Sequence, residues 1–167
     1  MFFAEALLPI DSPPVGLVTW FAANGAAVAM ATSWLGVVNG QPPELHAGCC
    51  GQLRGAQPFA LGTEFAVNIP ASMDVPILRQ LLPRTPPGRV LLIGAETELL
   101  PARSIRAPLL TGCTLQIECI SGRIDTCGWV PALAGHIVLL HRGGQCLDPA
   151  AYRDFCALSP LRADLSA

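Results

Sequence analysis

The chain has 167 residues, of which 51% are hydrophobic and only 13% are charged, against roughly 25% charged in an average soluble chain. Ten arginines and no lysine face twelve acidic residues, which gives a net charge of −2. This balance leaves no basic face for a phosphate backbone and excludes most nucleic-acid roles, and the hydrophobicity excludes intrinsic disorder. The length is that of one domain, and we expect a single domain over 1–167.

An uncharged stretch near the start of the chain raises the question of a membrane span. Residues 12–43 contain no Asp, Glu, Lys or Arg, but Pro13-Pro14, Asn24-Gly25, Asn39-Gly40 and Pro42-Pro43 interrupt them. A spanning helix needs about 20 unbroken apolar residues with basic flanks. A secretory signal needs a basic start, which the first eight residues lack. We therefore expect no membrane association.

The cysteines indicate the redox compartment. The chain has seven, an odd number, with neither a Cys-x-x-Cys motif nor Cys/His ligand spacing. This pattern predicts no metal site. Reduced, mostly buried thiols are typical of the cytoplasm, which is the expected location.

The first part of the chain predicts paired strands. Asn24-Gly25 separates two apolar runs, Val15–Phe21 and Ala27–Thr32, which is a strong β-hairpin signal. The run Leu35–Val38 leads into a turn containing Pro42-Pro43, and Leu45–Cys50 is predicted as the third strand.

The middle of the chain mixes loops, short helices and one strand. Residues 51–56 form a glycine-punctuated loop, and a short helix begins near Pro58 and ends near Gly62. Phe65–Ile69 is a compact strand that stops at a proline. A helix over 74–82 and a proline-rich connector over 84–88 follow.

The last part of the chain predicts further strands and a terminal helix. Val90–Ile93 fits either a helix turn or a strand, and Pro101–Leu110 is an irregular crossing segment. Thr114–Ser121 alternates as a half-buried strand does, and Ile137–Leu140 is another strand. A helix is expected over 149–157. Several short strands with two or three short helices predict a small β-barrel with helical insertions.

Several segments share their residues and their order with one family: Pro14–Phe21, Ala29–Trp34, Glu64–Pro70, Leu100–Leu110 and Thr114–Cys119. Together, over about residues 12–142, they resemble the flavin reductase-like family, which includes flavoredoxin-like proteins. The resemblance implies a mainly β fold, the FMN-binding type of split β-barrel with short helical insertions. It also implies an FMN or FAD cofactor and a homodimer with flavin sites at or near the interface.

The resemblance places one flavin-cradling segment on Ala31, Thr32, Ser33 and Trp34. Backbone amides and hydroxyls at such positions suit the polar edge of the ring and the ribityl chain. The alternative is that Thr32-Ser33 merely ends a strand.

The second family segment falls on Gly48, Cys49, Cys50, Arg54 and Gly55. A glycine-rich loop lets backbone N–H groups approach a phosphate, and Arg54 is the only Arg or Lys in residues 12–78. The alternative for Arg54 is a solvated surface side chain. Many family members have a hydroxyl residue where this chain has Gly55 or the following alanine, which implies a weaker phosphate grip. A redox role for Cys49-Cys50 beside the flavin is a further alternative.

Histidines and tryptophans supply the remaining candidates. His136 resembles the histidine of a Gly-Asp-His segment that lies near the nicotinamide in two-component flavin reductases, but here Gly135 replaces the aspartate and His141 replaces an expected glycine. The alternative for His136 is a strand-entry histidine bonded to the backbone. His46 is interpreted as structural or as part of an interface. Trp34 is favoured over Trp129, which lies in an expected loop over 127–131, for stacking on the ring.

The function implied by the resemblance is an NAD(P)H-dependent flavin reductase that passes hydride from NADH or NADPH to flavin N5. Reduced flavin would then serve a second, electron-accepting protein. No protein acid or base is obligatory for hydride transfer, which fits the absence of a carboxylate pair or nucleophilic triad. The alternatives are an FMN-binding electron carrier and a dimeric binding module without cofactor. So few charged residues also favour a homodimer, since a monomer would expose apolar patches.

Overall fold

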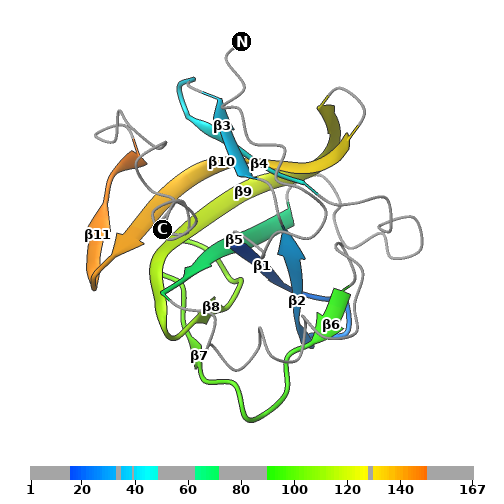
Figure 1. Cartoon of the computed structure of the whole chain (residues 1–167), viewed down its shortest axis with the longest axis vertical. Coiled ribbons are helices and arrows are strands. Elements are labelled where there is room, and N and C mark those ends of the chain that lie inside the picture. The colour runs from blue at the N-terminus through cyan, green and yellow to red at the C-terminus, as the bar shows by residue number, and fades with distance from the viewer. Residues whose placement is uncertain are drawn as a thin grey trace, which may run out of the picture.

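The computed structural model describes residues 16–32, 35–38, 40–48, 63–71, 90–127 and 130–149. Within these ranges the chain is built from β-strands (Figure 1). In chain order the strands are β1 Gly16–Phe21, β2 Ala27–Thr32, β3 Leu35–Val38, β4 Glu44–Gly48, β5 Thr63–Pro70, β6 Val90–Leu92, β7 Leu99–Leu100, β8 Leu109–Leu110, β9 Cys113–Cys127, β10 Val130–Arg142 and β11 Gln145–Leu147.

The predicted hairpin at the start is confirmed. β1 and β2 pair antiparallel from Gly16 opposite Thr32 to Phe21 opposite Ala27. At the turn, Gly25 has a φ of 80°, a left-handed conformation that glycine adopts without steric cost. The side chain of Asn24 accepts a hydrogen bond from the Ala26 amide at 3.0 Å. The Asn-Gly pair therefore reverses the chain as its composition predicts.

Three local expectations need correction or completion. Leu35–Val38 is itself a strand, β3, which pairs with β4, so the predicted third strand is the fourth and ends at Gly48 among the described residues. The ambiguous run at 90–93 forms β6 beside β2. The expected loop over 127–131 is too long, because Cys127 of β9 pairs with Val130 of β10; residues 128 and 129 between them lie outside the described residues. In each case pairing with another strand decides a segment that is too short to decide by pattern.

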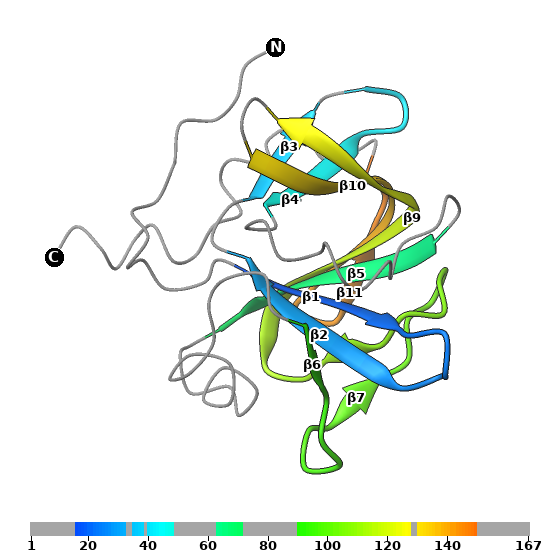
Figure 2. The same cartoon turned by 90° about the vertical axis from the view of Figure 1, so that its right-hand side faces the viewer.

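The strands form one large antiparallel sheet in the order β3-β4-β10-β9-β5-β1-β2-β6. The sheet curls strongly along the long strands β9 and β10, so that its two ends bend toward each other (Figures 1 and 2). Along the side of β10 that faces away from β9, the first part of the strand pairs with β4 and the last part pairs with β11. The mainly β split barrel expected from the resemblance is confirmed.

The main core lies between apolar side chains from almost every strand of the large sheet. Its largest fully buried members include Trp20, Phe65, Met30, Leu133 and Leu140. Gly135 allows a close approach here: a Cβ atom at this position would lie 2.5 Å from Cε1 of Phe65. Glycine at 135 therefore lets β10 pack against the aromatic ring.

Polar side chains of the sheet hold the irregular segment that precedes β8. Thr19 donates a hydrogen bond to the Pro108 carbonyl at 2.6 Å, and the buried Asn68 side chain accepts one from the Leu110 amide at 2.9 Å. Glu64 accepts the Arg106 amide at 2.8 Å. These bonds satisfy backbone groups that have no ladder partner, as buried backbone groups require. The expected irregular crossing over 101–110 is confirmed up to the short strand β8.

The helical predictions cannot be compared with the fold. The helices expected over 58–62 and 74–82 lie outside the described residues, as does the helix over 149–157 beyond its first residue. Among the residues that are described, no helix is long and apolar enough to cross a membrane.

Candidate functional site

The ends of β2 and β4 meet at a corner of the sheet. Thr32 is 1% exposed, and its Oγ1 donates a hydrogen bond to the carbonyl oxygen of Gly48 at 2.7 Å. The two residues come together because β3 follows β2 and folds back to pair with β4. This Thr32–Gly48 corner thus joins the starts of the two segments that the sequence assigned to flavin. The Thr32 hydroxyl is used to hold these segments together.

The other predicted cofactor-binding residues are placed less completely. Ala31 is half-buried and packs against the small cluster of Leu17, Ala29 and Leu110. The remaining predicted residues lie outside the described part of the chain: Ser33, Trp34, Cys49, Cys50, Arg54 and Gly55. Because its hydroxyl donates to Gly48, Thr32 can contribute to a flavin site by positioning the two segments.

His136 lies away from this corner. It pairs with Glu44 across β10 and β4, whereas Gly48 pairs with Ala132 four residues earlier, a separation of roughly 13 Å along the strands. Its Nδ1 lies 3.8 Å from Oε2 of Glu44 and has no hydrogen-bond partner among the described residues. The structure therefore does not bring His136 to Thr32, and backbone groups do not satisfy this ring nitrogen.

A first carboxylate cluster surrounds Glu44. Its Oε1 lies 2.6 Å from Nη2 of Arg123 and 2.7 Å from Nε2 of His46, and Arg123 also lies 3.6 Å from Asp125. Burial opposes ionisation of Glu44, but the hydrogen bonds and charges of Arg123 and His46 outweigh it and lower its pKa. His46 is buried, with 7% of its surface exposed, in a structural environment as interpreted from the sequence.

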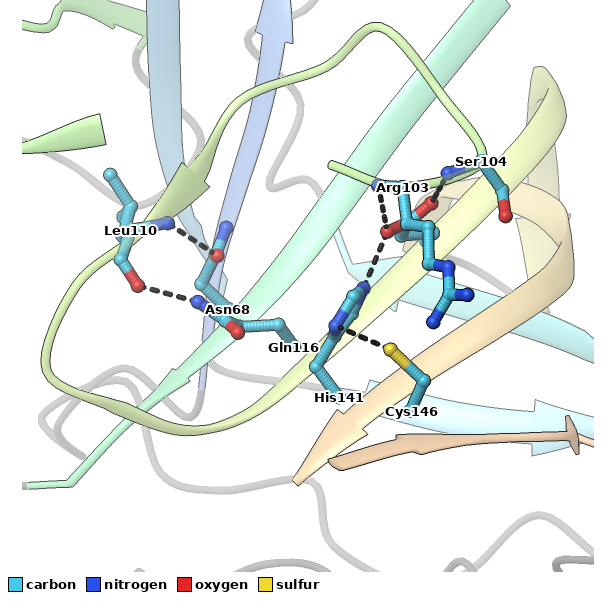
Figure 3. Close-up of polar contacts among 8 residues, drawn as sticks. Asn68, Arg103, Ser104, Leu110, Gln116, His141 and Cys146 are labelled. Carbon is cyan, nitrogen blue, oxygen red and sulfur yellow. Dashed lines mark hydrogen bonds and ion pairs between the residues drawn. The ribbon is translucent and has the colours of Figure 1, made fainter. Parts of the chain in front are cut away.

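A second carboxylate cluster surrounds Glu118, which is fully buried on β9. Its Oε1 accepts the Arg103 amide at 2.8 Å, and its Oε2 accepts the Ser104 amide at 2.7 Å. Nε2 of His141 lies 2.5 Å from Oε1. On the other side of the ring, Nδ1 of His141 lies 3.5 Å from Sγ of Cys146. Figure 3 shows the ring of His141 next to the thiol, with the Arg103 side chain alongside.

The described thiols differ in their surroundings. Burial raises the pKa of Cys113 to about 12, and burial with the charge of Glu118 raises the pKa of Cys119 well above its usual value. Cys146, in contrast, is exposed. It also lies beside Arg103, and the proximity of Cys146 raises the pKa of that guanidinium. Among the described cysteines, Cys146 has both access to solvent and polar neighbours.

Sequence reasoning missed the Glu118 cluster. One signal was present: Gly143-Gly144 can form a two-residue turn that sets His141 opposite Cys146. The position of Glu118 in an otherwise apolar strand was a second signal, because a buried carboxylate needs partners. Within the described residues, no group of three or more His, Cys, Asp or Glu could hold a metal ion.

Comparison with solved structures identifies the fold. An NADH:FAD oxidoreductase from Streptomyces globisporus is 18% identical, with a TM-score of 0.59 over 91% of this chain and 97% of that one. A second structure of that oxidoreductase is a complex with NAD and FAD fragments. Flavoredoxin from Methanosarcina acetivorans is 22% identical, with a TM-score of 0.61 over 94% of this chain and 85% of that one.

Nitrilotriacetate monooxygenase component B from Bacillus cereus is also similar. It is 20% identical, with a TM-score of 0.59 over 80% of this chain and 71% of that one. No protein-family model and no curated protein matches the sequence. The chain therefore has the split-barrel fold that flavin oxidoreductases and flavoredoxin share, as the sequence resemblance predicts.

Proposed function

We propose that this protein is a flavin-binding oxidoreductase, an NAD(P)H-dependent flavin reductase that uses FMN, with FAD as the alternative flavin. The main structural support is the Thr32–Gly48 corner, where a 2.7 Å hydrogen bond joins the starts of the two segments assigned to flavin. The similar structures support it, because they include an NADH:FAD oxidoreductase and its complex with NAD and FAD fragments.

In this proposal the protein's own contribution is binding and orientation. The backbone and hydroxyls that continue from Thr32 and Gly48 would hold the flavin ring, and Arg54 would hold its phosphate. Bound flavin would supply the chemistry, which is the acceptance of hydride from NADH or NADPH at N5. Positioning the two rings face to face is the protein's share of the rate enhancement.

Cofactor identity is the first test. Purified protein, or protein mixed with FMN or FAD, is examined by absorbance and mass spectrometry, and NADH and NADPH oxidation is then followed. The proposal expects bound flavin and turnover above that of free flavin. Flavin binding without such turnover would support an electron carrier, which the similarity to flavoredoxin favours. Absence of flavin binding would contradict both and leave a binding module.

Two matched threonine variants test the corner. Thr32→Val removes the hydrogen bond to Gly48 but keeps the side-chain shape, and we expect about threefold to tenfold weaker flavin binding. Thr19→Val removes a buried bond to Pro108 at the crossing segment, together with the bond that Thr19 accepts from Asn68, and should leave flavin affinity unchanged. Flavin fluorescence titration, with melting curves for both variants, makes the comparison. Equal affinity losses in the two variants would remove Thr32 from the site.

A phosphate contact from Arg54 has its own test. Arg54→Ala should weaken FMN binding more than riboflavin binding, because riboflavin has no phosphate. Equal losses for both ligands would leave Arg54 without this role.

Assembly and location complete the proposal. A homodimer is supported by large apolar side chains that the single chain leaves exposed: Phe21, Leu92, Leu99, Leu100 and Ile124. Three described cysteines that form no disulfide, Cys113, Cys119 and Cys146, support a cytoplasmic location. An electron-accepting partner protein is the expected consumer of reduced flavin. Sedimentation of a stable monomer would contradict the dimer.

A further inference from the structure

The hairpin between β10 and β11 sets His141 against Cys146. These two residues pair directly across the strands, on either side of a turn made by Gly143 and Gly144. Directly paired residues project to the same face of a sheet, and here Sγ of Cys146 lies 3.5 Å from Nδ1 of His141. The thiol and the ring are therefore held together by strand register.

The opposite edge of the ring is held by Glu118. His141 pairs with Gln116 of β9, so Glu118 is its diagonal neighbour two residues along that strand. The two carboxylate oxygens already accept the amides of Arg103 and Ser104, so they act as acceptors toward the ring as well. Nε2–H of His141 accordingly donates to Glu118. This arrangement leaves Nδ1 as the acceptor that faces the thiol.

The surroundings of Cys146 combine access with positive charge. Its side chain is exposed, and the guanidinium of Arg103 lies beside the thiol (Figure 3). A guanidinium stabilises a thiolate and also binds carboxylates. Cys113 is half-buried and Cys119 is buried, and in the described contacts neither thiol lies beside a guanidinium or an imidazole.

We propose that Cys146 is a site of reversible mixed-disulfide formation, at which an exposed thiol with His141 as its base exchanges with low-molecular-weight disulfides that carry carboxylates. This role is independent of flavin binding. Glu118 is a positioning residue that acts through His141, and Arg103 binds a carboxylate of the incoming disulfide.

Mixed-disulfide formation at Cys146 is a thiol–disulfide exchange that begins with a proton transfer. Nδ1 of His141 takes the proton from the Cys146 thiol, and the resulting thiolate attacks one sulfur of the disulfide. The disulfide's S–S bond breaks as a new S–S bond forms at Cys146. The departing thiolate takes the proton from Nδ1 and leaves as a free thiol, so Cys146 is oxidised and one half of the disulfide is reduced.

Oxidised glutathione is the probe, used with the full-length protein at neutral pH. Intact-mass and peptide mass spectrometry should show one glutathionyl group on Cys146 before any on Cys113, and added reductant should remove it. Cys146→Ser should abolish this modification, whereas Cys113→Ser should leave its rate unchanged. Faster modification at another cysteine, with Cys146 unmodified, would overturn the proposal.

The role of His141 as the base is tested by comparing variants of two histidines on β10. His141→Asn should slow modification of Cys146 by about tenfold, because a thiol without a base is only a few per cent ionised at neutral pH. His136→Asn, on the same strand and beside the other glutamate, should leave this rate unchanged. His141→Gln provides the same comparison should the asparagine variant not fold. An unchanged rate in folded His141 variants would overturn the proposal.

The roles of Glu118 and Arg103 are separated by the charge of the probe. Glu118→Gln should slow exchange with oxidised glutathione and with uncharged hydroxyethyl disulfide equally, and should slow a His141→Asn protein no further. Arg103→Ala should slow exchange with oxidised glutathione more than exchange with hydroxyethyl disulfide, and Arg106→Ala, on the same exposed segment, should slow neither. Equal effects of Arg103→Ala on both probes would overturn the carboxylate preference. Additive effects of Glu118 and His141 would overturn the positioning role.

Discussion

Two glutamates of the same sheet, Glu44 and Glu118, each contact a histidine at close range, yet their surroundings differ. Glu44 is 18% exposed and contacts side chains only, chiefly the guanidinium of Arg123 and the ring of His46. Glu118 is fully buried, and two of its three described contacts are backbone amides of the crossing segment. The first is a charge network at the edge of β4, whereas the second joins three parts of the chain.

The difference shows that the residue pair alone does not set the role. A carboxylate near solvent can exchange protein partners for water, so its net contribution is small. A buried carboxylate cannot exchange its protein partners for water. When it is removed, the groups that donated hydrogen bonds to it are left without an acceptor. We therefore expect Glu118 to be important for stability and Glu44 mainly for local charge.

Removal of each carboxylate tests this comparison most directly. Glu118→Ala should lower the free energy of unfolding by about 2–4 kcal/mol, because several donors lose their acceptor together. Glu44→Ala should lower it by about 1 kcal/mol or less. Chemical denaturation of both variants measures the two losses. Equal losses would show that burial does not separate the two glutamates.

Asn68 tests whether burial or charge matters more. Its uncharged side chain is fully buried, donates to Thr19 at 2.9 Å and accepts the Leu110 amide at 2.9 Å. Asn68→Ala should lower the free energy of unfolding by about 2–3 kcal/mol, close to the loss at Glu118, because it leaves buried partners unsatisfied. A loss as small as that of Glu44→Ala would indicate that charge, not burial, distinguishes Glu118. Denaturation under the same conditions makes the comparison.

Salt should affect the two glutamates differently. Arg123 is partly exposed, with 36% of its side chain accessible, so its attraction to Glu44 is screened at about 1 M salt, where the Debye length is about 3 Å. The loss caused by Glu44→Gln, about 0.5–1 kcal/mol at low salt, should shrink toward zero. The loss caused by Glu118→Gln should persist. Denaturation at low and high salt measures both, and a persistent loss at Glu44 would contradict its assignment as a solvent-screened network.

The smallest expected effect is a pH dependence. The pKa of Glu44 lies below its ordinary value of 4.5 in the folded protein, so the unfolded state binds this proton more tightly. Its stabilising contribution is fully present above pH 4.5 and is lost as the pH falls through the lowered pKa. The difference in unfolding free energy between the wild type and Glu44→Gln should therefore shrink between about pH 5 and pH 3. A difference that grows on acidification would contradict the lowered pKa.

The sequence pattern predicted those elements whose structure depends on residues close together in the chain. Asn24-Gly25 between two apolar runs located the first hairpin, and alternation located the first half of β9. Short runs were harder, because four residues such as Leu35–Val38 carry too little periodicity to distinguish a strand from a connection. Their state depends on partners: β4 for this run and β2 for β6.

The candidate site shows the same division. The order of motifs led to Thr32 and Gly48, and the structure places these two residues in contact. The Glu118 cluster draws on positions 23 and 5 residues apart, which only the registers of β9, β10 and β11 bring together. The register of β9 against β10 cannot be read from one sequence, because shifting a strand by one residue exchanges its two faces.

The turn at Gly143 and Gly144 has a consequence for how this chemistry could be gained or lost. Both glycines have positive φ, 56° and 80°, and the turn fixes the register that sets Cys146 opposite His141. Inserting or deleting a single residue there would turn the thiol to the other face of β11 and leave β9 and β10 intact. The reactivity of this edge is thus encoded in the length of a loop, and it can vary among proteins of this fold while the barrel stays the same.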